Sequence, residues 1–242
     1  MTFTNTIIPL FSSALSFVFA IFIFKRYVDR KGMHLLIWGI GIIFYGIGGF
    51  SEAYYGAIGW NPLIFRLWYL FGAILVAAWL GQGTVYLLAK RRWANVLTVL
   101  LLLGSIYATY RIFTAELDPT QMTTSLHTGS ELSGDAIVTS GIRSLTPIFN
   151  LYGTVALVGG AIYSAFIFWR KKIFLHRTLG NLLIAVGALA PAFGGAFSRY
   201  GIPGALYIGE FFGVILLFAG FIRATTPMKN VESQPVPTPA GD

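Results

Sequence analysis

Long apolar runs alternate with short polar connections along this chain. Seven runs are long enough to cross the roughly 30 Å hydrocarbon core of a bilayer, which takes about 20 mostly apolar residues. They are Ile7–Phe24, His34–Gly49, Leu63–Leu88, Ala94–Phe113, Pro147–Trp169, Thr178–Phe197 and Ala205–Ile222. The second run is short unless its helix continues to Tyr54. The pattern predicts an all-α fold, a polytopic bundle of seven transmembrane helices within residues 1–223.

Two segments lie outside the apolar pattern. Residues 114–146 are rich in Ser, Thr and Gly and too polar for lipid, so we expect an external loop. A loop of this length usually has a purpose, such as covering a cavity or meeting a partner. Residues 224–242 carry three prolines near their end and predict a flexible cytoplasmic tail.

Composition excludes a soluble domain. The 242 residues are 56% hydrophobic and 11% charged, whereas charged residues make up about a quarter of soluble domains. The first apolar run does not follow the signal-peptide pattern, because its basic residues come after it. We therefore expect a multi-pass protein of a cell membrane, with a prokaryotic plasma membrane as the expected location.

Basic residues are distributed unevenly between the connections. Thirteen of the 17 Lys and Arg residues follow odd-numbered spans, whereas Arg66, Arg111, Arg143 and Arg199 lie on the opposite side. The positive-inside rule then predicts an outside N-terminus and a cytoplasmic C-terminus. The net charge of +8 is explained by basic residues that orient the helices in the membrane and contact anionic headgroups. We therefore expect the lipid bilayer as a partner, and no nucleic acid.

Small residues recur at helical spacing in the last two spans. Ala205, Gly209 and Gly213 share one helix face, which Gly220 continues. Small residues let neighbouring backbones approach, so this stripe predicts tight helix packing. In the sixth span, Pro191 removes a backbone hydrogen bond and is expected to kink the helix, which can open a cavity or form a hinge.

A single carboxylate, Glu210, lies within the apolar stretch "GALYIGEFFGV". If this helix begins near Pro203, Glu210 lies roughly 10 Å below the outer surface. An unpaired charge at such depth costs at least about 2.5–3.5 kcal/mol, so the side chain should face the bundle interior. Glu52, Arg66 and Arg199 are expected near the same level.

These four charges have two interpretations. In one, Glu210 pairs with Arg199 or Arg66 and locks the helices together. In the other, the charges line a polar pocket that opens outward, with the external loop as its lid and Tyr45 among its floor residues. The candidate ligand-binding residues are Glu52, Arg66, Trp68, Tyr69, Arg199, Tyr207 and Glu210. Gln82, within "LGQGT", and Asn150 instead predict hydrogen bonds between helices.

Sequence signals for particular chemistries are absent. The chain has no cysteine, and its three histidines are scattered, so no metal-ligand spacing exists. No lysine lies within a span, which excludes a retinal Schiff base. Neither a nucleotide-binding nor a hydrolase fingerprint is present. A membrane hydrolase built on Ser51 or Ser198 lacks an evident general base. We therefore expect no cofactor and no metal, assign no catalytic residue, and favour a function other than catalysis.

The second and third spans carry a family resemblance. They read "HLLIWGIGIIFYGIGGFSEAYY" and "FRLWYLFGAILVAAWLGQGTVYLLAKRR". A Trp/Gly-rich helix ends in an acid, Glu52, and the next helix carries an early arginine, an aromatic pair and a glycine, namely Arg66, Trp68, Tyr69 and Gly72. This pattern resembles the seven-helix membrane input modules of bacterial histidine kinases. The resemblance implies an outward-facing, ligand-sensing bundle. Only 19 residues follow Arg223, so we expect no attached kinase and a signal passed to a separate protein.

Two functions remain open at this stage. The first is a stand-alone sensory or ligand-binding module that takes a small molecule or lipid in an outer pocket. The second is a non-catalytic structural or accessory subunit that contacts another protein in a larger membrane complex. A transporter or a lipid-modifying enzyme is a more distant alternative.

Overall fold

The computed structural model describes residues 3–118, 120, 132–171, 175–202 and 204–225. Within them the chain is helical and contains seven helices long and apolar enough to cross a membrane. The predicted seven-span bundle is thereby confirmed. The spans, in chain order, are α1 (Phe3–Arg30); α2 (Met33–Ile58); α3 (Pro62–Leu67), η1 (Trp68–Leu75) and α4 (Val76–Leu88); α5 (Arg91–Phe113); α7 (Leu145–Thr154), η3 (Val155–Gly159) and α8 (Gly160–Arg170); α9 (Leu175–Arg199); and α10 (Ala205–Thr225).

The second span is longer than its apolar pattern indicates. Helix α2 continues past Gly49 and Tyr54 to Ile58. Gly59, with φ of 101°, ends it, and Asn61 then caps α3 by accepting hydrogen bonds from the amides of Leu63 and Ile64. Pro203, near which the last helix was expected to start, lies outside the described residues. Residues 226–242 of the predicted tail lie outside them as well.

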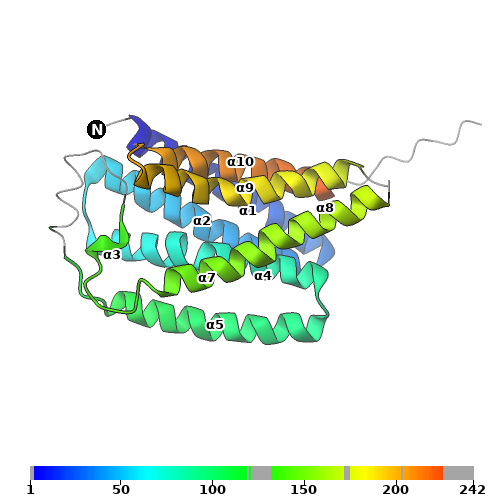
Figure 1. Cartoon of the computed structure of the whole chain (residues 1–242), viewed down its shortest axis with the longest axis horizontal. Helices are drawn as coiled ribbons and strands as arrows, with labels where there is room; N and C mark the ends of the chain where they lie inside the picture. Colours follow the sequence, from blue (N-terminus) through cyan, green and yellow to red (C-terminus); the bar gives the residue numbers. More distant parts are fainter. Residues whose placement is uncertain (1–2, 119, 121–131, 172–174, 203, 226–242) are drawn as a thin grey trace, which may run out of the picture.

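The helices run side by side, and the bundle has two distinct ends (Figure 1). We call the end with the start of α1 and the described part of residues 114–144 the loop end. The opposite end, which carries the basic connections after α1, α4 and α8, is the basic end. Because the number of spans is odd, Phe3 and Thr225 lie at opposite ends.

Helices α9 and α10 pack through glycines, as the small-residue stripe predicts. Gly180, Gly187 and Gly194 repeat every seven residues on α9 and face α10. A Cβ on Gly187 would lie 2.8 Å from the carbonyl oxygen of Gly213, and one on Gly209 would lie 2.6 Å from that of Ala190. The two backbones therefore touch, and no side chain fits between them.

Pro191 lies within this contact. Helix α9 continues through it to Arg199, and its ring carbon Cδ is 3.2 Å from where a Cβ of Gly213 would be. The side chain thus takes part in helix packing. A hinge role for Pro191 stays a prediction.

Two spans contain π-helical segments, eight residues of the third span (η1) and five of the fifth (η3). A π-helix is a rare widening of the α-helix that frequently occurs at functional sites. The apolar pattern of both spans is continuous, so the sequence does not reveal these segments.

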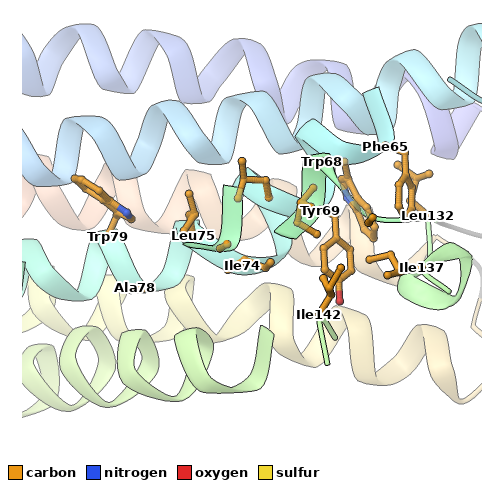
Figure 2. Close-up of a cluster of buried hydrophobic side chains, with 14 of the residues drawn as sticks. Phe65, Trp68, Tyr69, Ile74, Leu75, Ala78, Trp79, Leu132, Ile137 and Ile142 are labelled. Atoms are coloured by element: carbon orange, nitrogen blue, oxygen red, sulfur yellow. The ribbon is translucent and has the colours of Figure 1, made fainter. Parts of the chain in front are cut away.

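The buried apolar residues form two clusters. One joins α1, α2, α9 and α10 to parts of the third and fifth spans, and its members Phe19, Ile42 and Val214 are inaccessible to solvent. The other surrounds the third span and includes loop residues (Figure 2). Leu132, Ala136, Ile137 and Ile142 of the polar loop are nearly inaccessible to solvent. The described part of the loop is therefore packed onto the bundle as a cap.

Candidate functional site

Glu52 is a buried carboxylate near the loop end of α2. Its side chain is 1% exposed. The indole Nε1 of Trp68 donates a hydrogen bond to its Oε1 at 2.9 Å. Trp68 is also the first residue of the π-helix η1. The predicted site residues Glu52 and Trp68 are thus in direct contact.

A glycine pair explains how the two spans come close enough for this bond. Gly48 lies one turn before Glu52 on α2, and Gly72 lies one turn after Trp68 on η1. A Cβ on Gly48 would lie 3.0 Å from the Cα of Gly72. Because the backbones meet at these glycines, the Glu52 and Trp68 side chains lie within hydrogen-bonding distance.

Tyr45 connects this region to the last span. Its hydroxyl donates a hydrogen bond to the backbone carbonyl of Glu210 at 2.8 Å. The same hydroxyl lies within electrostatic range of both carboxylates, Glu210 and Glu52. Tyr207, one turn before Glu210 on α10, is fully buried. The structure therefore gathers two acids with three aromatic residues, Tyr45, Trp68 and Tyr207, across three spans. We call these five residues the acidic cluster.

The two arginines expected beside the acids lie elsewhere. Arg66 donates hydrogen bonds to the carbonyl oxygens of Ile112 and Ala115, at 3.1 and 2.9 Å. The last carbonyls of a helix have no partner within it and carry partial negative charge, so they attract a guanidinium. Arg199 is exposed at the end of α9. Neither arginine forms an ion pair with Glu52 or Glu210 in the described structure. The expected neutralisation of these acids by Arg66 or Arg199 is therefore wrong.

Tyr69 belongs to the loop contact. Thr146 donates a hydrogen bond to its hydroxyl oxygen at 3.1 Å, and a Cβ on Gly134 would lie 2.8 Å from its ring. Figure 2 shows the Tyr69 ring beside Ile142. Tyr69 thus holds the loop cap on the third span.

Polar contacts fix the shape of the loop cap. Asp118 and Val138 donate backbone hydrogen bonds to Ala136 and Glu116, which pairs the two sides of the loop. Asp135 and Arg143 form an exposed salt bridge of 2.8 Å. Residues 119 and 121–131 lie outside the described structure, so a lid over a pocket stays a prediction.

Gln82 is the centre of a second polar group, nearer the basic end. Its side chain is fully buried. Its amide donates to the carbonyl of Ala94 at 2.9 Å and to the Thr98 hydroxyl at 2.8 Å, and it accepts a hydrogen bond from Tyr152. Asn150 donates to the carbonyl of Ala73 at 3.1 Å. The predicted interhelical hydrogen bonds of Gln82 and Asn150 are confirmed.

Some hydrogen bonds between helices give no signal in the sequence. Trp79 donates a hydrogen bond to Ser105 at 3.2 Å, and Ser13 donates to the carbonyl of Gly46 at 2.8 Å. Arg26, in the first basic block, donates to the carbonyl of Thr225 at the end of α10. A serine or tryptophan within an apolar run does not identify its partner, because that depends on which helices become neighbours.

In the described part of the chain, no group of three or more His, Asp and Glu side chains that could hold a metal ion comes together. Comparisons with protein-family models, curated proteins and solved structures found no match to this chain.

Proposed function

We propose that this protein is a sensory or ligand-binding module of a prokaryotic plasma membrane, with the acidic cluster as its ligand site. The observation that supports this most is Glu52, a buried carboxylate of α2 that accepts a hydrogen bond from Trp68, the first residue of the π-helix η1. Acids at membrane depth are costly, and those retained mark ligand or ion sites by default.

Charge complementarity favours a ligand with a cationic group. The acidic cluster brings the carboxylates of Glu52 and Glu210 together with the aromatic side chains of Tyr45, Trp68 and Tyr207. Aromatic faces and carboxylates both attract cations, and their combination recognises organic ammonium groups. An organic amine is therefore the ligand class that fits best.

The proposal includes an orientation and an output. The loop end faces outward and the basic end faces the cytoplasm, because positively charged connections are retained inside. The amine reaches the acidic cluster from outside. A change in the packing of α2, η1 and α10 then passes to a separate protein at the basic end.

A ligand screen with matched variants tests this proposal. Purified protein in lipid nanodiscs is heated with a panel of organic amines, and binding is measured as a shift in the unfolding temperature. Glu52→Gln and Glu210→Gln each remove one carboxylate. We expect about 30-fold weaker binding or more, since truncating one partner of a buried charge pair costs about 2–5 kcal/mol. Asp135→Asn, which removes an exposed acid of the loop cap, is the control and should bind normally. Equal binding by all three variants, or stabilisation by no amine, would contradict the proposal.

The accessory-subunit alternative has one observation in its favour. The α5 span is only 22% buried, the lowest share among the seven spans. Its exposed apolar side chains include Val99, Leu103, Ile106 and Tyr110. A partner helix could cover this face. Co-purification of one protein in a fixed ratio, crosslinked through position 106, would favour this function over a sensory one.

A further inference from the structure

A groove between the third and fifth spans reaches the basic end. It has a volume of about 320 Å³, at the lower end of the roughly 300–1,000 Å³ typical of small-molecule sites. Its lining residues are Thr84, Val85, Leu88, Ala89, Val155, Ala156, Gly159, Gly160 and Tyr163. Apart from the hydroxyls of Thr84 and Tyr163, these side chains offer only apolar surface.

Two adjacent glycines, Gly159 at the end of η3 and Gly160 at the start of α8, shape the groove. At Gly160 the helices touch, since a Cβ there would lie 2.9 Å from Cδ1 of Leu88. At Gly159 a Cβ would have no atom within 4 Å. Val155 and Tyr163 on the same span are 65% and 56% exposed. The groove therefore opens sideways, toward the space that lipid chains occupy around a membrane span.

Positive charge surrounds the basic end of the groove. Ala89, which lines it, is followed by Lys90, Arg91 and Arg92, all exposed. On the other side α8 ends in the exposed Arg170. Segments 87–96 and 160–171 contain no acidic residue. Trp93 and Trp169, which are 65% and 63% exposed, flank the same end and are suited to the headgroup level of a membrane.

From these observations we propose that the groove binds an anionic phospholipid. One acyl chain lies along Val85, Leu88 and Gly159, and Lys90 and Arg91 contact the phosphate. Basic residues at the end of a membrane span attract anionic headgroups, whereas the apolar, laterally open groove suits a hydrocarbon chain. This inference uses none of the residues of the acidic cluster and stands apart from the proposed amine site.

Lipid binding to the full chain in detergent provides the test. Native mass spectrometry measures the binding of phosphatidylglycerol and of phosphatidylcholine with identical acyl chains. Lys90→Gln/Arg91→Gln removes the headgroup contacts, and Gly159→Leu fills the open space. Two controls match them. Lys25→Gln/Arg30→Gln removes two exposed charges from another basic block, and Ala219→Leu enlarges an exposed residue of α10.

We expect the unaltered chain to retain phosphatidylglycerol more tightly than phosphatidylcholine. Lys90→Gln/Arg91→Gln should weaken phosphatidylglycerol binding about 25-fold, at roughly fivefold for each basic residue. Phosphatidylcholine binding should fall less, because its choline group already offsets the charge of the phosphate. Gly159→Leu should weaken the binding of both lipids. Both control variants should bind the two lipids as the unaltered chain does. The inference is overturned if the two lipids bind equally, if Lys25→Gln/Arg30→Gln has the larger effect, or if folded Gly159→Leu protein binds as before.

Discussion

Buried polar side chains in this protein are placed by specific hydrogen bonds between helices. Gln82 uses both its amide nitrogen and its oxygen to join α4 to α5 and to Tyr152 of α7. Glu52 is bonded to Trp68, and Arg66 is bonded to the end of α5. These bonds matter most for α5, which has little apolar burial of its own.

Replacement of Gln82 tests how much such bonds contribute. Gln82→Leu removes the bonds to Thr98 and Ala94 and leaves the Tyr152 hydroxyl without its acceptor. We expect a loss of about 1–3 kcal/mol in the free energy of unfolding, measured by denaturant titration in mixed micelles. Thr109→Val is the control, because the hydroxyl of Thr109 bonds within its own helix, to the carbonyl of Ser105. A smaller loss for Gln82→Leu than for Thr109→Val would mean that α5 is held by other contacts.

Neighbouring helices approach each other closely at glycines in several places. Gly187 and Gly213 lie where the backbones of α9 and α10 meet. Helices η1 and α2 likewise pack closely where Gly72 meets Gly48. Since interiors are already close-packed, one added methyl at such a contact forces the helices apart.

Two alanine substitutions on α9 distinguish a contact glycine from a free one. Gly187→Ala would place a Cβ 2.8 Å from backbone atoms of α10, whereas at Gly195 the nearest atom is a leucine methyl carbon 3.7 Å away. We expect Gly187→Ala to lower the unfolding free energy by about 1–3 kcal/mol. Gly195→Ala should be neutral or stabilising by up to about 1 kcal/mol. Thermal unfolding of both variants in the same detergent measures the difference, and equal midpoints would argue against the close α9–α10 contact.

On the scale of the whole molecule, charge and loop structure distinguish the two ends. The loop end is closed over the third span by the loop cap, and the basic end carries the blocks of Lys and Arg. This asymmetry underlies the proposed orientation, with the amine site outside and the lipid groove at the cytoplasmic side.

The absence of cysteine allows a direct test of orientation. Ser140→Cys places a thiol on the exposed loop cap, and Arg92→Cys places one at the exposed basic end. A membrane-impermeant maleimide added to intact cells should label position 140 and should reach position 92 only after the membrane is opened. The reverse labelling pattern would contradict the orientation and place the acidic cluster at the cytoplasmic side.

The sequence alone was sufficient to predict the seven spans, the packing stripe of α10 and the bonding roles of Gln82 and Asn150. These features are local, since a run of about 20 apolar residues, a glycine every few residues or an amide within lipid has the same consequence in nearly any bundle. The sequence also identified Glu52, Trp68, Tyr207 and Glu210 as candidate ligand-binding residues. The partners of these residues, however, could not be worked out.

Those partners were decided by the tertiary structure. Arg66 was expected beside the acids because they lie at similar depth, yet its guanidinium bonds the end of α5. The depth of a side chain in the membrane follows from its position along the span. The direction in which it points depends on how its helix is rotated and on which helices are its neighbours. The π-helices, the burial of loop residues such as Ile142, and the groove at Gly159 have the same origin. Each depends on contacts between segments distant in the chain, which no local pattern specifies.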